Sequence, residues 1–225
     1  MLINEWMSRG VITIKNSDSL NDAMRIFQKK MISMLPVLSR GSLVGIVTDG
    51  DIKKAMPSDA TTLDKYEIRS LMDSVKIESV MSKPVITIGK NHTVDEAAVI
   101  MLSKGISGMP VVNGMDDIEG IITKSDVFRC LVSFTGAAHA GQIFAFRIKD
   151  MPGIIKTITD VIRMGGGRLS SILTSYDDVE DGFRKVFIHS FDIPEANFDN
   201  VVEQLRESAQ MLYLADQTRN IRKLF

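Results

Sequence analysis

Residues 45–51 read GIVTDGD, and residues 120–126 read GIITKSD. Both heptapeptides place a glycine, two apolar residues, a threonine and an aspartate in the same positions. Each contains a β-branched apolar run and leads into a segment with helical spacing, so each predicts a strand that turns into a helix. A strand-to-helix turn that occurs twice with the same residues indicates two copies of one structural unit.

Two further motifs precede each heptapeptide in the same order. The first joins Met-Ser to the tetrapeptide VITI, and the second joins Ile-Ser to Pro-Val. Three motifs, each present twice in order, indicate an internal duplication and not a chance match. The first motif occupies residues 7–14 and 81–88, and the second occupies residues 32–37 and 106–111.

Each copy predicts the element order β-α-β-β-α. The first helix of each copy is expected to begin at a hydroxyl residue that is followed three positions later by an acid, Ser19 with Asp22 and Thr93 with Glu96. That spacing is typical of a capping box. One unit of about fifty residues has too small a core to be stable alone, so we expect the two units to pack around a pseudo-twofold axis.

The pattern changes after residue 134. Small residues at 135–141 predict a linker. The elements beyond it are expected in the order βαββαβ, a ferredoxin-like split βαβ. The glycines at 165–167 are expected to end the first helix, one of them by adopting a positive φ. The whole chain is thus of the α/β class. Beyond the linker we expect strands at 142–148, 169–175, 184–192 and 211–215 and helices at 154–164 and 197–209.

Composition excludes several classes of function. The 225 residues include 27 Lys+Arg and 28 Asp+Glu, for a formal net charge of −1. We therefore expect neither nucleic acid nor a membrane as a partner. The single cysteine, Cys130, excludes an internal disulfide and a metal site made of several thiolates. We see neither a signal peptide nor an apolar run of membrane-spanning length, so we expect a cytoplasmic protein.

The residue patterns of enzymes are also missing. His92, His139 and His189 fall on separate expected elements, and none has a partner at the spacing of a metal motif. The sequence has no nucleophile elbow or phosphate-binding loop. Cys130 lies between apolar residues and is expected to be a small buried side chain. We predict no catalytic residue, no metal ligand and no catalytic cofactor, and thus a protein that is not an enzyme.

The three duplicated motifs resemble those of a tandem pair of CBS domains, a Bateman module. The third unit resembles an ACT domain, because the turn Asp150–Gly153 joins its first strand to its first helix. The order CBS–CBS–ACT is similar to the AcuB-type acetoin-utilisation family, which implies a regulatory protein. The implied domains are a first CBS repeat at 1–56, a helical inter-repeat segment at 57–79, a second CBS repeat at 80–134, a linker at 135–141 and an ACT-like domain at 142–225.

The resemblance implies two equivalent clefts that hold an adenosine compound, either AMP, ADP, ATP or S-adenosylmethionine, as a regulatory ligand. Each cleft takes its adenine-facing residues from one repeat, and a threonine and an aspartate, for phosphate and ribose, from the other. The first set is Ile12, Ile32 and Met34 with Thr123, Ser125 and Asp126. The second set is Ile86, Ile106 and Gly108 with Thr48, Gly50 and Asp51.

The two sets differ in charge. The second carries Asp49 beside Gly50 where the first carries Lys124 beside Ser125, and an extra carboxylate disfavours a phosphate. Our hypothesis is that a phosphorylated adenosine prefers the first cleft. Two alternatives stay open: both aspartates can be helix N-caps, and the pair can be a scaffold that binds no ligand.

ACT domains can bind the carboxylate of a small effector with free backbone N–H groups at the start of a helix. The corresponding positions here are Asp150, Gly153, Ile154 and Ile155. Amino-acid-binding members often carry an asparagine at the start of the second strand, where this chain has Arg168. Dimerisation without a ligand is therefore the alternative role. Together the resemblances imply a homodimer that regulates an unidentified protein.

Overall fold

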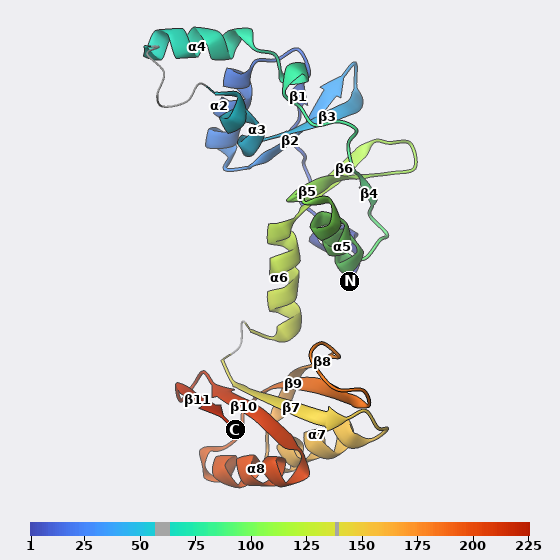
Figure 1. Cartoon of the computed structure of the whole chain (residues 1–225), viewed down its shortest axis with the longest axis vertical. Coiled ribbons are helices and arrows are strands. Elements are labelled where there is room, and N and C mark those ends of the chain that lie inside the picture. Colours follow the sequence, from blue (N-terminus) through green and yellow to red (C-terminus); the bar gives the residue numbers. More distant parts are fainter. Residues whose placement is uncertain (57–63, 138–139) are drawn as a thin grey trace. The chain divides into compact units, whose positions relative to one another are not determined.

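The computed structural model describes residues 1–56, 64–137 and 140–225. The chain forms two compact units, Met1–Phe128 and Arg129–Phe225 (Figure 1). The first unit contains two three-stranded sheets, and the second contains one five-stranded sheet. The predicted α/β class is confirmed.

The duplicated element order β-α-β-β-α is confirmed, and only its last helix continues past Phe128, the end of the first unit. In each copy the short first strand pairs in parallel with the second, which pairs antiparallel with the third. The first copy is β1 (Ile14–Lys15), α2 (Leu20–Lys30), β2 (Met34–Ser39), β3 (Ser42–Thr48) and α3 (Asp49–Ala55), and the second is β4 (Ile88–Gly89), α5 (Val94–Lys104), β5 (Gly108–Val112), β6 (Ile118–Thr123) and α6 (Lys124–Thr135).

The first strand of each copy is shorter than predicted. We expected residues 11–14 and 85–88, but pairing begins only at Ile14 and Ile88. A β-branched run favours extended backbone, yet a strand exists only where it pairs with a neighbour, and residues 11–13 and 85–87 do not pair with β2 and β5. The predicted capping boxes are confirmed: Ser19 Oγ accepts from Asp22 N at 3.2 Å, and Thr93 Oγ1 accepts from Glu96 N at 3.3 Å.

The segment that precedes each copy packs against the other copy, which the sequence analysis did not foresee. Helix α1 (Ile3–Trp6) is flanked by bridges that join Leu2 to Thr93 and Ser8 to Ile121. The short helix η1 (Ile77–Ser79) is flanked by the matching bridges, Ser19 to Lys76 and Ile46 to Ser82. This reciprocal exchange gives the first unit its pseudo-twofold symmetry.

Helix α4 (Lys65–Ser74) lies between the two copies in sequence and packs against α2. Asn21 Nδ2 donates to Asp73 Oδ1 at 2.7 Å, and Met72, which is 3% exposed, belongs to the core of the first copy. The expected helical segment was 57–79; its residues 57–63 lie outside the described residues, and its end contains the short helix η1. Helix α4 is therefore part of the packed structure of the first copy.

The second unit has the predicted βαββαβ order, with an additional edge strand, β11 (Ile221–Leu224), that the sequence analysis missed. The strand order is β11-β10-β7-β9-β8, antiparallel throughout. The other elements are β7 (Gln142–Lys149), α7 (Ile154–Met164), β8 (Arg168–Ser175), β9 (Phe183–Phe191), α8 (Glu195–Ser208) and β10 (Gln210–Asp216).

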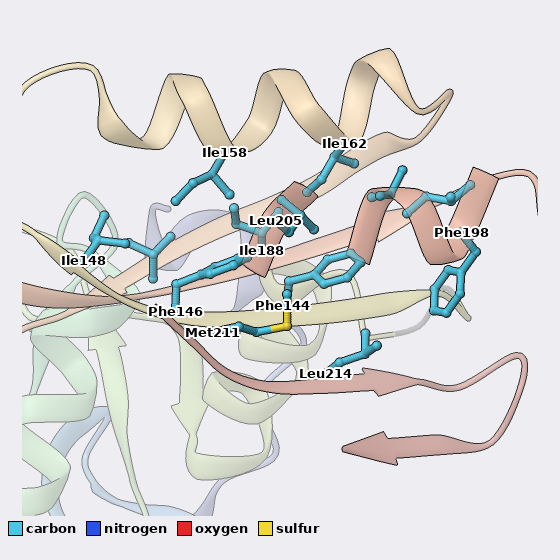
Figure 2. Packing of buried hydrophobic residues seen from close by; sticks show 13 residues of the cluster. Phe144, Phe146, Ile148, Ile158, Ile162, Ile188, Phe198, Leu205, Met211 and Leu214 are labelled. Atoms are coloured by element: carbon cyan, nitrogen blue, oxygen red, sulfur yellow. The ribbon is translucent and has the colours of Figure 1, made fainter. Parts of the chain in front are cut away.

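Helices α7 and α8 cover one face of this sheet and enclose its core (Figure 2). Phe144 and Phe146 of β7 and Ile158 and Ile162 of α7 are fully buried there. The glycines that follow α7 meet this core closely, since a Cβ on Gly167 would lie 2.7 Å from Ile193 Cγ1. The predicted positive φ falls on Gly166, at +91°.

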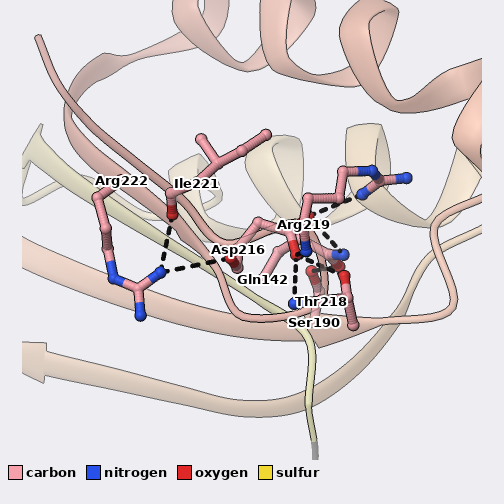
Figure 3. Close-up of polar contacts among 7 residues, drawn as sticks. All are labelled: Gln142, Ser190, Asp216, Thr218, Arg219, Ile221 and Arg222. Carbon is pink, nitrogen blue, oxygen red and sulfur yellow. Dashed lines mark hydrogen bonds and ion pairs between the residues drawn. The ribbon is translucent and has the colours of Figure 1, made fainter.

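A buried carboxylate holds the turn between β10 and β11 (Figure 3). Asp216 is 0% exposed and accepts from Gln142 Nε2 at 3.1 Å, Thr218 N at 2.8 Å and Arg219 NH1 at 2.7 Å. Burial alone would raise the pKa of Asp216, but hydrogen bonds from Thr218, Arg219 and Gln142 lower that pKa to about 2. Asp216 is therefore ionised near neutral pH and ties the turn to β7.

Candidate functional site

A cavity of about 760 Å³ opens in the first unit and is lined by both copies. All six residues of the first predicted set line it: Ile12, Ile32, Met34, Thr123, Ser125 and Asp126. Ile12 precedes β1, Ile32 follows α2 and Met34 begins β2, whereas Thr123 ends β6 and the other two lie in the first turn of α6. The structure thus brings together residues that are roughly 90 to 115 positions apart in the chain, as expected of a site between two repeats.

The threonine and the aspartate of this set bind each other. Asp126 is 4% exposed, and its Oδ2 accepts from Thr123 N at 2.8 Å and from Thr123 Oγ1 at 2.7 Å. Thr48 and Asp51 make the same contacts in the first copy, at 2.9 and 2.8 Å. Both aspartates therefore stabilise a helix start from inside its first turn, and Thr48, which precedes α3, is the N-cap there. The N-cap role predicted for the aspartates is wrong, and the hydroxyl proton of Thr123 points to Asp126.

The sequence analysis missed most of the helical lining. Helix α2 supplies Met24, Phe27 and Gln28, and Met31 follows at its end. These four positions have the spacing i, i+3, i+4, i+7, which places them on one helix face. That spacing was legible in the sequence, but it indicated only a buried face and not which cavity the face borders.

Helix α3 lines the cavity with a second such stripe, Asp49, Ile52, Lys53 and Met56. The sequence analysis assigned Asp49 to the second cleft beside Gly50, and this assignment is wrong. Successive residues of a helix point about 100° apart, so Asp49 lies on a different face from Thr48 and Asp51, which close the cap. The lining of this cavity does not include Lys124.

The charged groups of the cavity are of both signs. Asp49 Oδ2 lies 3.0 Å from Lys53 Nζ, and the side chains of Asp49 and Lys53 are 46% and 74% exposed. Arg9 NH2 donates to Asn4 Oδ1 at 2.8 Å, so the position of its guanidinium is fixed by an uncharged group. With Asp126, the lining contains two cations and two carboxylates, set around an apolar floor.

The second predicted set does not line this cavity. Thr48 ends β3, and Gly50 and Asp51 lie in the first turn of α3. Gly108 begins β5, where a Cβ would lie 2.8 Å from Ile122 O, so this glycine is required by packing between strands. Ile86 and Ile106 are half-buried and precede β4 and β5.

The second unit has a cavity of about 640 Å³ beside the turn that precedes α7. Gly153 and Ile154 line it, as the predicted effector positions require, and Gly153 has a φ of +89°. Asp150 does not line it, because its carboxylate meets Arg184 Nε at 3.3 Å and Tyr176 Oη at 3.2 Å. Ile155 does not line it either, since it packs against the core. The cavity also includes Arg147, Lys149, Met151, Lys156, Thr157, Phe183 and Gln210.

Within residues 1–56, 64–137 and 140–225, no three His, Cys, Asp or Glu side chains gather in a way that could hold a metal ion. Across the same residues, no helix combines the length and apolarity needed to span a membrane. Cys130 is buried, as predicted.

Relatives match a little more than half of this chain. "Uncharacterized protein MJ1225" of Methanocaldococcus jannaschii is 32% identical over 130 residues, which are 57% of this chain and 46% of that protein. The L-aspartate semialdehyde sulfurtransferase of the same organism is 33% identical over 129 residues, which are 57% of this chain and 23% of that enzyme. The chain thus spans less than half the length of both relatives.

Solved structures are similar to a comparable share of the chain. The CBS domain pair of protein MJ0100, in complex with 5′-methylthioadenosine and S-adenosyl-L-methionine, is 31% identical with a TM-score of 0.50 and covers 62% of this chain and 98% of its own. An acetoin utilization protein (AcuB) from Vibrio cholerae is 26% identical with a TM-score of 0.48, over 59% of this chain and 90% of its own.

The family profile for the CBS domain matches residues 3–58 and residues 77–133, about half of the chain. The two matches coincide with the two β-α-β-β-α copies that enclose the cavity. With its duplicated motifs, its reciprocal packing and this double match, the chain belongs to the CBS-domain family as a tandem pair.

Proposed function

We propose that the first unit is a non-catalytic sensor of an adenosine-containing ligand, bound in the cavity of about 760 Å³. The observation that carries the proposal is the convergence of Ile12, Ile32 and Met34 from one copy with Thr123 and Asp126 from the other on this cavity. The MJ0100 pair supports the proposal, because it is 31% identical and binds two adenosine compounds.

The lining suits a nucleoside. A cavity of this size falls within the range of small-molecule sites, which combine an apolar wall with a few polar groups. Ile12, Ile32 and Met34 provide an apolar wall for a planar base, and backbone groups beside them can meet its edge. Asp126 provides a carboxylate for ribose hydroxyls while one of its oxygens caps α6.

Because the ligand would contact both copies, it would favour one arrangement of the pair over others. Such a population shift can change how the chain engages a partner protein, and it requires no chemical step. The proposed output is therefore regulation of an unidentified protein by the occupancy of this cavity.

Thermal unfolding with AMP, ADP, ATP and S-adenosylmethionine tests the proposal. At a ligand concentration of about one hundred times Kd, a bound ligand stabilises the native state by about 2.7 kcal/mol, a shift of several degrees. Asp126→Ala is expected to reduce this shift. Glu96→Ala is the matched control, because it removes the equivalent capping-box carboxylate of α5, a helix that supplies no residue to the lining of this cavity.

The alternative is a scaffold that binds no ligand. No stabilisation by any of these compounds would support the scaffold and contradict the proposed sensor. An equal loss of binding in Asp126→Ala and Glu96→Ala would show that the loss of a helix cap, and not of a cavity group, is responsible.

For the second unit we propose an ACT-like role in binding a small anionic effector. The cavity beside Gly153 favours it, because Lys149 and Lys156 line the same space. A screen of amino acids and small carboxylates by thermal shift tests this role, and Lys149→Glu should weaken any hit. If no compound binds, the remaining proposal for this unit is homodimerisation, which light scattering on the full chain measures.

A further inference from the structure

Two positions of the repeated sequence carry methionine in the first copy and glycine in the second. The copies are related by an offset of 74 residues here, which pairs Met31 with Gly105 and Met34 with Gly108. Both methionines line the cavity of about 760 Å³. At two points of this lining the first copy therefore presents a long apolar side chain where the second copy has no side chain at all.

Met31 ends α2 in a backbone conformation that favours glycine. Its φ is 54° and its ψ is 39°, in the left-handed region, where a Cβ crowds the following carbonyl oxygen. Gly105 ends α5 at the equivalent point with a φ of 66°, and its N–H donates to Leu102 O at 3.3 Å. The next amide, Ile106 N, donates to Met101 O at 3.0 Å, which completes a helix ending in which glycine is usual. The first copy thus places a methionine where the second copy avoids the steric cost.

The other described non-glycine residues with a positive φ have local reasons for that conformation. Those at 116, 178, 192 and 220 are Asp or Asn, whose short polar side chains tolerate the left-handed region, and Arg40 lies in the turn between β2 and β3. Met31 has neither reason. It is also 90% exposed, so contacts within the chain do little to offset the cost of its conformation. An outlier of this kind is a reason to look for a function.

The side chain of Met31 continues the helical stripe that borders the cavity. It follows Met24, Phe27 and Gln28 on the same face of α2. A molecule bound in the cavity would cover apolar surface of Met31 that otherwise faces water, whereas glycine would offer no such surface. The unbranched thioether side chain can also adapt its shape to what it covers. The same residue therefore destabilises the free chain and stabilises a complex.

We infer that Met31 is a ligand-contacting residue that raises the affinity of this cavity at the expense of the stability of the free chain. The inference rests on the sensor function proposed above and adds the residue at which binding and stability oppose each other. Gly105 holds the same backbone conformation in the second copy without lining this cavity, so it has no part in the opposition. Because Met31 is next to Ile32 in the wall assigned to the base, its contribution is expected for every adenosine compound.

Met31→Gly in the full chain tests both halves of the inference. Without ligand, it removes the strained conformation but adds freedom to the unfolded chain, so the midpoint of thermal unfolding should rise by about 1–4 °C. In calorimetric titrations with AMP and with S-adenosylmethionine, the same variant should bind at least about fivefold more weakly, because an apolar contact is lost. Met31→Leu keeps an apolar side chain of similar volume and should retain most of the affinity.

Gly105→Met is the matched control in the second copy. A Cβ at Gly105 would meet no atom within 4 Å, so the change adds the cost of a non-glycine residue in the left-handed region and no clash. It should lower the midpoint of thermal unfolding by a similar amount and leave the Kd of the cavity for both compounds unchanged.

Unchanged binding in Met31→Gly, or no gain in the stability of its free chain, would overturn the inference and leave the proposed sensor intact. An equal loss of binding in Gly105→Met would also overturn it, because the loss would then not arise from contact with the ligand. Failure of both compounds to bind the unmodified chain would instead contradict the proposed function itself, so the two failures are distinguishable.

Discussion

Two glycines show why the repeated motifs occur together. A Cβ on Gly120 would lie 2.6 Å from Met7 Sδ, and a Cβ on Gly45 would lie 2.3 Å from Met81 Sδ. The methionine of each Met-Ser motif therefore packs on the heptapeptide glycine of the other copy. The motifs are linked by this contact across the pair, and not only by their order in the chain.

Gly120→Ala is expected to destabilise the first unit by about 1–3 kcal/mol, as overpacking does in a tight core. Met7 can move, but Ser8 O would also lie 3.0 Å from the new methyl group and belongs to backbone. Urea unfolding measures the effect, and Gly114→Ala, which meets no atom within 4 Å, is the control. Adding Met7→Ala should recover part of the loss, and strict additivity of the two changes would argue against this contact.

The lowered pKa of Asp216 predicts how the stability of the protein depends on pH. Its folded pKa of about 2 lies below the usual value for an unfolded aspartate, so its contribution is complete above about pH 5 and is lost as pH falls from about 4 to 2. The amount is about 2 kcal/mol for a shift of this size. Asp216→Asn should therefore be less stable at pH 7 and show a flatter acid dependence in unfolding experiments from pH 2 to 7. Asp178→Asn, at an exposed turn, should retain the dependence of the unmodified protein.

At the scale of an element, helix α4 has one face that is buried and one that is partly exposed. It lies between the two copies in sequence, but one of its faces completes the core of the first copy through Met72, while Leu71 beside it is 41% exposed. Helix α3 also has two separate faces, one of which closes a cap while the other lines the cavity.

Met72→Ala is expected to cost about 2–5 kcal/mol, because it deletes a buried side chain and leaves a cavity. Leu71→Ala on the same helix should cost less than about 1 kcal/mol, since that side chain is partly exposed. Denaturant unfolding of both variants measures the difference. Equal effects would indicate that α4 is a solvated connection and not part of the core.

In the first unit as a whole, each copy is completed by a segment that precedes the other copy in the sequence. The segment around α1 hydrogen-bonds to the second copy, with Ser8 N donating to Ile121 O at 2.9 Å, and Ile77 N donates to Asp18 O of the first copy at 2.9 Å. The second unit, in contrast, holds its entire core cluster between Phe144 and Leu214.

Residues 1–56 alone are therefore expected to lack cooperative unfolding, whereas residues 1–137 and residues 129–225 should each unfold cooperatively. The physical reason is that a single copy loses both its exchanged segment and the partner that completes its core. Circular dichroism during thermal unfolding distinguishes these outcomes. A cooperative transition in residues 1–56 would show that the exchange is dispensable.

Local signals in the sequence predicted most elements well. The capping residues Ser19 and Thr93 fixed two helix starts, and the apolar spacing of residues 154–164 matched α7 to the residue. Strands that depend on distant neighbours were predicted less well: β1 and β4 are shorter than their β-branched runs, and β11 was missed. Helix signals are contained within a few residues, whereas a strand exists only where another strand meets it.

The sequence by itself determined the duplication and, except for β11, the element order of both units, whereas the six residues of the first predicted set followed from the resemblance to CBS domains. It did so because caps, periodicity and repeated motifs are local or directly comparable along the chain. Only the tertiary structure decided that Asp49 borders the cavity with Ile12 and Asp126. It also decided that Met7 packs against Gly120 of the second copy. Which face of a helix borders which cavity depends on how the copies pack, and that packing is a sum of many distant contacts that no short motif encodes.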